Sequence, residues 1–258
     1  MKWISRSALN GELFTGTWLS MGSPLSAEVV GITGFDWALI DLEHGSGDLK
    51  DLYYQLMALE PSSTSAIVRV PAIDPVIFKG VLDLGPAGLM VPHVSDVAAA
   101  SRLVDYARIP PLGLRGAATS TRASGYGSAY REYLSECNEN LMLIAQIESI
   151  DGMENADAIA KVDGIDVLFV GPTDLSIALG VSHELEDPVF RRAIVDIAKA
   201  ASENGKTAGA LVRNPQEVPE YLAMGYTFLS VGSDRGMIYK GMQETMNMFR
   251  SLRVQVRR

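Results

Sequence analysis

Eight short apolar runs recur along the chain, and segments with helical spacing separate most of them. Each run is bounded by turn residues, a pattern typical of a strand in a parallel sheet that is covered on both faces. The runs are 16–20, 37–41, 66–70, 88–91, 141–147, 166–170, 207–211 and 227–231. We therefore predict eight buried strands.

The segments between the runs have helical periodicity, and several begin with a capping residue. Asp74 precedes Pro75 and Asp187 precedes Pro188, which is typical of helix N-termini. The predicted helices are 26–32, 49–59, 75–84, 94–107, 152–162, 188–204, 214–223 and 236–252. Strict alternation of strand and helix implies parallel strands with right-handed crossovers. Eight such units favour a closed (β/α)₈ TIM barrel, a single α/β domain over residues 1–258, and no linker interrupts them.

The longest irregular segment is 109–133, which contains Pro110, Pro111, four glycines and three arginines. A loop of this length in a compact domain is usually functional or disordered. We expect it to lie on the upper rim of the barrel and to cover the active site.

Bulk properties exclude several classes of partner. The net charge is −9 and the pI is about 4.9, which argues against binding to nucleic acid or an anionic membrane. Cys137 is the only cysteine, so no intrachain disulfide is possible. No run approaches the roughly 18 apolar residues of a membrane helix, and we expect a cytoplasmic protein.

Four polar residues stand at or just beyond the carboxyl ends of predicted strands: His44, Arg69, Glu148 and Asp174. The active sites of (β/α)₈ barrels are assembled at that end of the strands. Together they supply a base, a guanidinium and two carboxylates. We therefore expect a catalytic site there.

Glu148 and Asp174 are the candidate metal ligands. Two neighbouring carboxylates repel each other unless a cation lies between them. An all-oxygen ligand set suits Mg²⁺ or Mn²⁺. For Asp174 an equally good explanation is a helix cap within Thr173-Asp174-Leu175-Ser176.

His44, oriented by Asp41, is the candidate acid or base, and His93 is the second choice. Arg69 needs an anion if it is buried, either a structural Asp or Glu or a substrate carboxylate. Arg69 could also stabilise a developing enolate oxygen.

None of the seven lysines closes a strand at its carboxyl end, which disfavours a Schiff-base mechanism. Gly232-Ser233 and Arg235-Gly236 could hold a phosphate after the last strand, and an ordinary strand-to-helix turn explains them equally well.

Several motifs, taken together and in order, resemble the HpcH/HpaI class II pyruvate aldolases, relatives of 4-hydroxy-2-oxoheptanedioate aldolase. The resemblance covers about Gly16 to Phe249. Its carriers are Gly34 to Gly45, Val68-Arg69-Val70-Pro71, Leu82 to Gly88, Val91-Pro92, Arg115-Gly116, Arg122-Ala123-Ser124, Gln146-Ile147-Glu148-Ser149, Gly171 to Ser176 and Val231 to Asp234.

The resemblance implies a role for each matching residue in binding or catalysis. Glu148 and Asp174 would bind a divalent cation that chelates pyruvate, with Mg²⁺, Mn²⁺ and Co²⁺ as the alternatives, and no organic cofactor is implied. His44, supported by Asp41, would be the acid/base group, and Arg69 would polarise the keto oxygen. Gln146 would hydrogen-bond near the metal, and the backbone of Gly171, Pro172 and Thr173 would hold the pyruvate carboxylate.

The resemblance also implies an assembly. Asp83 matches a position that reaches into the site of a neighbouring subunit. Family members are typically hexamers, trimers of dimers that exchange their last helix. The apolar stripe of Ile238, Met242, Met246 and Phe249 suits a packed helix, and an unswapped barrel would need the same stripe.

The chain departs from the family pattern at 117–121, within the segment expected to touch the aldehyde, so the aldehyde specificity is not implied. Our hypothesis is a metal-dependent aldolase that cleaves a 4-hydroxy-2-oxo acid to pyruvate and an aldehyde. The alternatives are a carbon–carbon lyase acting on a CoA thioester, such as a citryl- or malyl-CoA lyase, and a non-catalytic barrel that binds a 2-oxo acid.

Overall fold

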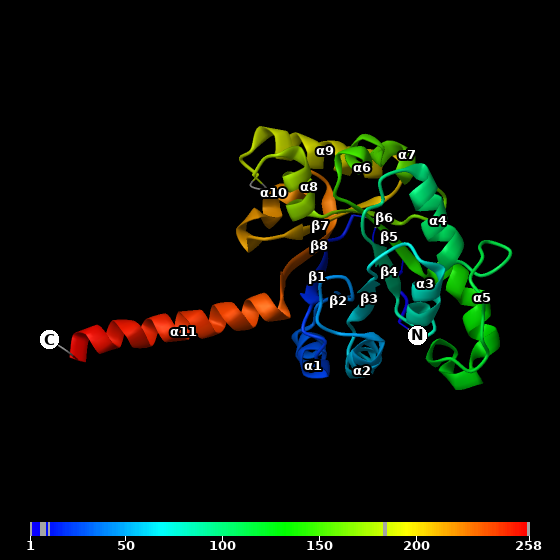
Figure 1. Ribbon diagram of the computed structural model, residues 1–258, viewed down its shortest axis with the longest axis horizontal. Coiled ribbons are helices and arrows are strands. Elements are labelled where there is room, and N and C mark those ends of the chain that lie inside the picture. Colours follow the sequence, from blue (N-terminus) through cyan, green and yellow to red (C-terminus); the bar gives the residue numbers. More distant parts are fainter. Residues whose placement is uncertain (1, 6–8, 10, 183–184, 257–258) are drawn as a thin grey trace.

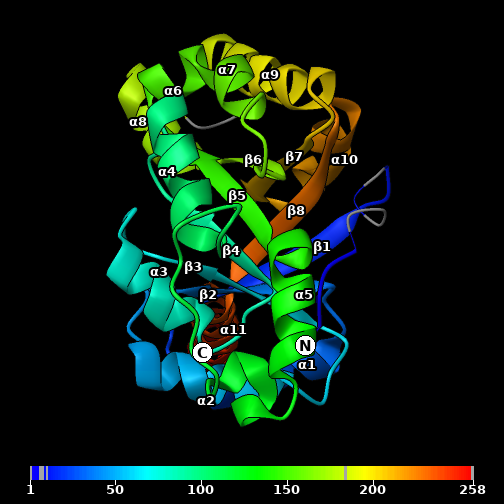
Figure 2. The same ribbon diagram turned by 90° about the vertical axis from the view of Figure 1, so that its right-hand side faces the viewer.

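Eight parallel strands close into a barrel in which each strand pairs with its neighbours in sequence and β8 pairs with β1 (Figures 1 and 2). The computed structural model describes residues 2–5, 9, 11–182 and 185–256. The strands are β1 (Phe14–Leu19), β2 (Trp37–Asp41), β3 (Ser65–Arg69), β4 (Gly88–Val91), β5 (Met142–Ile147), β6 (Val167–Val170), β7 (Thr207–Val212) and β8 (Tyr226–Ser233). The predicted (β/α)₈ barrel is confirmed.

Helices connect successive strands and cover the outside of the barrel; α7 and α9, for example, lie side by side in Figure 2. The helices are α1 (Pro24–Thr33), α2 (Leu49–Leu59), α3 (Pro75–Leu82), α4 (Val97–Ala107), η2 (Arg122–Gly127), α5 (Tyr130–Asn140), α6 (Ile150–Glu154), α7 (Ala156–Ala160), α8 (Pro172–Leu179), α9 (Pro188–Glu203), η3 (Pro215–Glu217), α10 (Val218–Ala223) and α11 (Asp234–Val256). The predicted helix 152–162 is two short helices, and α5 and α8 were not predicted as helices.

The predicted caps at Asp74 and Asp187 are present. The Asp74 carboxylate accepts the backbone N–H groups of Val76 and Ile77 at 2.8 and 3.0 Å. The Asp187 carboxylate accepts the N–H of Val189 at 2.9 Å. Each carboxylate satisfies donors that the first helical turn leaves unpaired.

Aromatic side chains fill the inside of the barrel. Trp37 stacks on Phe228 with ring centroids 4.3 Å apart, and Phe169 meets both rings edge-on. A Cβ atom on Gly16 would lie 2.2 Å from the Trp37 ring, so only glycine leaves room for this stack. A second apolar cluster fills the space between the sheet and the helices. The inside of the barrel is therefore a packed core, and a ligand can bind only at an end of the barrel.

The expectation that residues 109–133 cover the mouth of their own barrel is wrong. Helix α4 runs back along the barrel and ends at its amino end, where β5 begins, so the connection between them belongs to that end. Within it, the N–H of Ala123 donates to the Asp83 carbonyl at 3.0 Å, and Arg122 donates to the Leu84 carbonyl at 2.8 Å. The segment therefore lies on the face opposite the carboxyl ends of the strands.

Helix α11 projects away from the barrel as a single long helix (Figure 1). The four side chains of its apolar stripe are 39 to 70% exposed: Ile238, Met242, Met246 and Phe249. Such a row of solvent-facing apolar groups is typical of a surface that another polypeptide covers. Among the described residues, no helix combines the length and apolarity needed to cross a membrane.

Candidate active site

The alternation of side chains along each strand produces a polar layer at the carboxyl end of the barrel. On three strands, the side chains that face the barrel interior change from apolar to polar toward the carboxyl end. On β2, Trp37 and Leu39 are followed by Asp41, and on β3, Ile67 is followed by Arg69. On β5, the interior series Met142 and Ile144 continues to Gln146 and then Glu148. Because strand side chains alternate with a period of two, these polar groups lie in one layer above the apolar core of the barrel.

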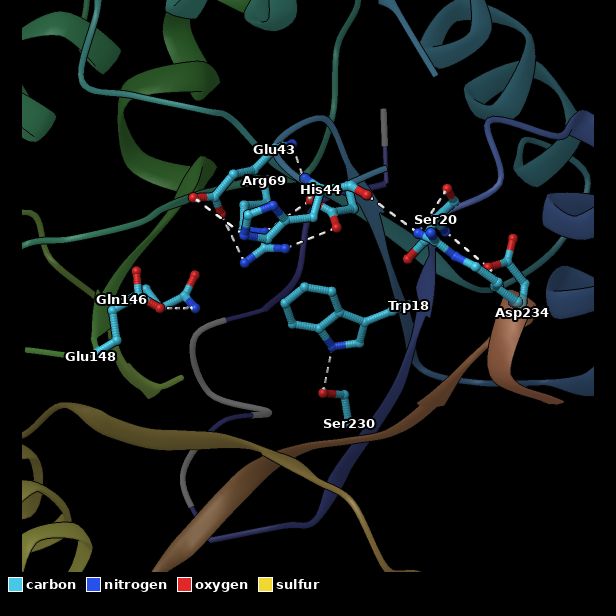
Figure 3. A network of polar contacts seen from close by, with 11 residues as sticks. Trp18, Ser20, Glu43, His44, Arg69, Gln146, Glu148, Ser230 and Asp234 are labelled. Carbon is cyan, nitrogen blue, oxygen red and sulfur yellow. Dashed lines mark hydrogen bonds and ion pairs between the residues drawn. The ribbon is translucent and has the colours of Figure 1, made fainter. Parts of the chain in front are cut away.

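Arg69 is held rigidly in this layer (Figure 3). Its Nε and Nη2 atoms donate to the two oxygens of Asp41 at 2.9 and 2.8 Å, and its Nη1 atom lies 2.8 Å from Glu43 Oε2. The guanidinium carbon also lies 4.5 Å from the centroid of the Trp18 ring, and the Arg69 side chain is only 6% exposed. The expectation that Arg69 meets a carboxylate is confirmed, and its partners are Asp41 and Glu43.

Asp41 does not take the expected place beside the His44 imidazole. Its Oδ1 atom accepts the backbone N–H groups of Glu43 and His44 at 3.1 and 3.3 Å, in addition to the bond from Arg69. The acidic group near the ring is Glu43, whose Oε1 atom lies 4.0 Å from His44 Nε2. The expectation that Asp41 orients the imidazole is therefore wrong, because Arg69 and the loop backbone occupy its oxygens. Asp41 shapes the loop that carries His44, whose side chain is 70% exposed at the barrel mouth.

Glu148 is a buried carboxylate with an unusual proton affinity. Its Oε1 atom accepts the N–H of His93 at 2.9 Å and lies 3.4 Å from His93 Nδ1, and its Oε2 atom accepts Nε2 of Gln146 at 2.5 Å. Burial raises the pKa of Glu148 to about 7, the His93 contacts oppose this rise, and the charges of Asp174 and Glu43 add to it. His93, the second-choice base, therefore contacts a candidate metal ligand.

Asp174 lies in the first turn of α8, and it does not cap that helix. The N-cap position is Gly171, and no side chain makes a cap hydrogen bond there. A Cβ atom on Gly171 would lie 2.3 Å from Glu148 Oε2 and 2.7 Å from Gln146 Nε2. Glycine therefore keeps the space beside these two groups open, and the helix-cap explanation of Asp174 loses its support.

A cavity of about 240 Å³ brings most of these predicted residues together. Its wall is formed by Trp18, His44, Arg69, Gln146, Phe169, Gly171, Pro172, Thr173, Asp174 and Leu211. Glu148 lies directly behind this wall, hydrogen-bonded to Gln146. Asp83 ends α3 at the amino end of the barrel and does not line this cavity. The structure thus joins the base, the arginine and the two carboxylates and leaves Asp83 apart from them.

The donor set at this cavity suits a hard divalent cation. Glu148 and Asp174 supply carboxylate oxygens, and the buried Oε1 atom of Gln146 has no hydrogen-bond partner. Among the described residues, no three His, Cys, Asp or Glu side chains form a complete metal-binding group. Two carboxylates would therefore hold a cation only with further oxygen ligands from substrate or water, as is common for Mg²⁺.

Two residues that contact Arg69, Trp18 and Glu43, were missing from the sequence prediction. Trp18 faces the barrel interior from β1, donates to Ser230 Oγ at 2.8 Å and packs its ring on Arg69 (Figure 3). It belonged to an apolar run, so no sequence signal separated it from the core. Glu43 adjoins His44, and the signal was its place between two residues already assigned to the site.

Comparison with known proteins places the chain in one family. A model of the family described as HpcH/HpaI aldolase/citrate lyase matches residues 15–240. The 5-keto-4-deoxy-D-glucarate aldolase of Enterobacter sp. (strain 638) is 40% identical over 239 residues, which cover 93% of each chain. The enzyme of the same name from Shigella dysenteriae serotype 1 (strain Sd197) is 40% identical over 91% of each chain.

Solved structures agree with this assignment. A HpcH/HpaI aldolase/citrate lyase family protein from Burkholderia cenocepacia J2315 superimposes with a TM-score of 0.90 at 32% identity and covers 95% of this chain and 98% of its own. The citrate synthase SbnG superimposes with a TM-score of 0.85 at 30% identity and covers 97 and 98% of the two chains. The resemblance inferred from the motifs is confirmed: the chain belongs to the HpcH/HpaI aldolase/citrate lyase family and is a carbon–carbon lyase.

Proposed function

We propose that this chain is a divalent-metal-dependent aldolase that cleaves a 4-hydroxy-2-oxo acid to pyruvate and an aldehyde and also catalyses the reverse addition. The observation that carries the proposal is the polar layer around the 240 Å³ cavity, where Arg69, Gln146 and Asp174 surround a space of the size that a small 2-oxo acid needs. The curated relatives named 5-keto-4-deoxy-D-glucarate aldolase support the same reaction class.

The two carboxylates, Glu148 and Asp174, would hold the cation. The cation would supply positive charge beside the keto and carboxylate oxygens of pyruvate and thereby stabilise negative charge that develops there. The cavity wall from Gly171 to Thr173 is the N-terminus of α8. Within it, the Gly171 N–H donates to the Ile147 carbonyl and Pro172 has no N–H, so the N–H of Thr173 and the helix dipole would favour the carboxylate of pyruvate.

Arg69 acts on the keto oxygen. Asp41 and Glu43 fix its guanidinium, so its orientation costs little when the substrate binds. When the C3–C4 bond breaks, its electron pair becomes negative charge on the enolate oxygen. The positive charge of Arg69 stabilises this oxygen. The adjacent Trp18 ring excludes water from one side of the guanidinium.

His44 moves the proton. Bond cleavage requires loss of the proton from the 4-hydroxyl group, and His44 lies on the cavity wall with its ring at the barrel mouth. An exposed ring next to Glu43 can take up this proton, and a proton delivered to C3 of the enolate, from this ring or from solvent, then completes pyruvate. The aldehyde half of the substrate therefore points outward from Arg69 toward the mouth.

We also propose that the chain assembles into a hexamer, a trimer of dimers, through α11. The exposed apolar stripe on that helix supports the assembly, because a helix that projects from its own barrel has no other partner for this face within the described residues. In the assembly Asp83 would reach the mouth of a neighbouring barrel. Mixed oligomers of His44→Ala and Asp83→Asn subunits would then recover activity that neither variant has alone, and failure of this complementation would contradict the arrangement.

The proposed function is tested by pyruvate release from a 4-hydroxy-2-oxo acid. Treatment with EDTA should abolish the release, and Mn²⁺ or Mg²⁺ should restore it. Full activity of the metal-free protein would refute the metal requirement. Competition by CoA, or turnover of a CoA thioester in place of the 2-oxo acid, would instead support a citryl- or malyl-CoA type lyase.

A further inference from the structure

His93 has a backbone conformation that is unusual for a residue with a side chain. Among the residues that the structure describes, only His93 and Tyr126 combine a Cβ atom with a positive φ angle, 52° and 56°. This left-handed region is sterically costly for such residues, and they persist in it where the surrounding structure determines the backbone. Tyr126 lies in η2 on the amino face of the barrel. His93 lies at the carboxyl end, two residues after β4, and contacts Glu148.

The backbone turns at His93 because the residues on either side are fixed. Strand β4 ends at Val91, and Pro92 has no N–H group with which to continue the ladder. The N–H of Val94 donates to the Gln146 carbonyl of β5 at 3.2 Å. Pro92 and Val94 are buried, whereas the side chain of His93 is 65% exposed. The packing of the imidazole therefore does not require the left-handed conformation.

The turn directs the N–H of His93 out of the sheet and toward the Glu148 carboxylate. The N–H donates to Glu148 Oε1 at 2.9 Å, and the Glu148 side chain is 2% exposed. When the carboxylate is ionised, such a bond is charge-assisted and stronger than one between neutral groups. His93 Nδ1 lies 3.4 Å from the same oxygen, beyond the usual range of a hydrogen bond. The closer contact of His93 with Glu148 is therefore made by the backbone.

Gln146 holds the other oxygen of the carboxylate. Its Nε2 atom donates to Glu148 Oε2 at 2.5 Å. Oε2 also faces the N-terminus of α8, the helix that carries Asp174, because a Cβ atom on Gly171 would lie 2.3 Å from it. With a donor on each oxygen, the carboxylate cannot rotate without losing both bonds, and each oxygen keeps a lone pair for a further partner. Glu148 is thus oriented before any cation binds.

We propose that His93 is a positioning residue whose left-handed backbone directs its N–H onto Glu148 and, together with Gln146, holds the carboxylate in the orientation that receives the divalent cation. The inference rests on the proposed metal-dependent function, and it assigns the role to the backbone of residue 93 and not to the imidazole. Loss of a contact that orients a metal ligand typically lowers metal affinity about 10- to 100-fold. A side chain that disfavours the left-handed conformation at this position should therefore weaken cation binding.

The test is a series of substitutions that all remove the imidazole and differ in the cost of a positive φ angle. The variants are His93→Gly, His93→Asn and His93→Val. Glycine adopts this conformation freely, asparagine tolerates it, and β-branched valine strongly disfavours it. The Kd for Mn²⁺, measured by calorimetry without substrate, should be about 10-fold or more higher for His93→Val than for His93→Gly, with His93→Asn close to His93→Gly.

Equal Kd values in the three variants would overturn the inference. If all three bind Mn²⁺ more weakly than the wild type by the same factor, the imidazole holds the site and the backbone does not. If all three match the wild type, residue 93 does not position Glu148.

Tyr126 provides the matched control, because it has the same φ requirement outside the candidate active site. Tyr126→Gly and Tyr126→Val both lose the hydroxyl contact with Tyr53, which is 3.0 Å long in the wild type. At each position the valine variant should have a lower Tm than the glycine variant, because valine is strained there. Only at position 93 should the Kd for Mn²⁺ differ between the two. A valine-to-glycine ratio of Kd that is as large at 126 as at 93 would show a general loss of stability and would contradict the positioning role.

Hydrogen exchange gives a second test that does not depend on the folding of His93→Val. In the metal-free wild type, the His93 amide should exchange slowly, as resolved by mass spectrometry. Glu148→Ala should accelerate this exchange about 10-fold or more relative to the Val94 amide, whose partner is the Gln146 carbonyl in both proteins. Fast exchange of the His93 amide in the wild type, or the same relative rate in both proteins, would refute the contact on which the inference depends.

Mn²⁺ binding to the wild type separates this inference from the proposed function. Mn²⁺ binding and exchange of the pyruvate methyl protons in the wild type, together with equal Kd values in the series, would overturn the role of His93 and leave the aldolase proposal standing. Absence of Mn²⁺ binding to the wild type would overturn both, because there would be no cation for which Glu148 is positioned.

Discussion

The buried carboxyl group of Glu148 provides a quantitative prediction, because its pKa is raised from 4.5 to about 7 by burial. The folded protein therefore holds the Glu148 proton at pH values where the unfolded chain has released it. The contribution of Glu148 to the free energy of unfolding is greatest below pH 4.5. It decreases as the pH rises and is lost above about pH 7. A pKa difference of about 2.5 corresponds to about 3 kcal/mol.

The variant Glu148→Gln removes this titration and keeps the size of the side chain. Its amide oxygen can still accept the N–H of His93, which the carboxylate accepts at 2.9 Å in the wild type. In the metal-free protein, the stability of Glu148→Gln relative to wild type should therefore increase from pH 5 to pH 8 by about 2.5 kcal/mol, most of the full effect.

Urea unfolding of both proteins in EDTA at several pH values between 5 and 8 measures this difference. Glu154→Gln, which replaces an exposed carboxylate in α6, is the control and should show no such trend. Saturating Mn²⁺ should stabilise the wild type at pH 8 and leave Glu148→Gln nearly unchanged, because ligand binding stabilises only a protein that has the site. A stability difference independent of pH would refute the reasoning from burial.

Three further substitutions test the site. Arg69→Lys should lower kcat/KM about 100-fold or more in a pyruvate-release assay, because lysine cannot reproduce the fixed bidentate geometry, while Arg191→Lys should have no effect. Gly171→Ala should abolish both the stabilisation by Mn²⁺ and the activity, because its Cβ atom would lie 2.3 Å from Glu148 Oε2. A fully active variant would contradict the claim that glycine keeps this space open. His44→Ala should lower turnover and keep Mn²⁺ affinity, measured by calorimetry, and a large loss of affinity would show that its role is different.

Much of the fold was predictable because the strand runs are apolar on both faces. The bounds of β2 and β4 coincide with the predicted runs 37–41 and 88–91, where the turn residues on either side are unambiguous. Glu148 and Arg69 were recognisable because a charged residue at the end of an apolar run needs a partner. Helix α5 was missed because it lies inside a segment whose prolines and glycines predicted a loop.

The partner of Asp41 was not predictable from local sequence. His44 is three positions away along the chain, whereas Arg69 becomes its neighbour only through the register of β2 and β3, in which Asp41 is paired with Arg69. Register is a property of the whole barrel, so proximity in sequence favoured the wrong partner. The position of residues 109–133, in contrast, could have been predicted from the sequence. The direction of the chain after α4 already determines that this connection lies at the amino end of the barrel.

The exchange of pyruvate methyl protons for deuterium tests the central claim most directly, because it reports enolate formation without any aldehyde. The account predicts exchange, followed by mass spectrometry, in the presence of Mg²⁺, no exchange after treatment with EDTA, and strongly slowed exchange in Arg69→Lys. Undiminished exchange in the metal-free protein, or none with Mg²⁺ present, would contradict the account.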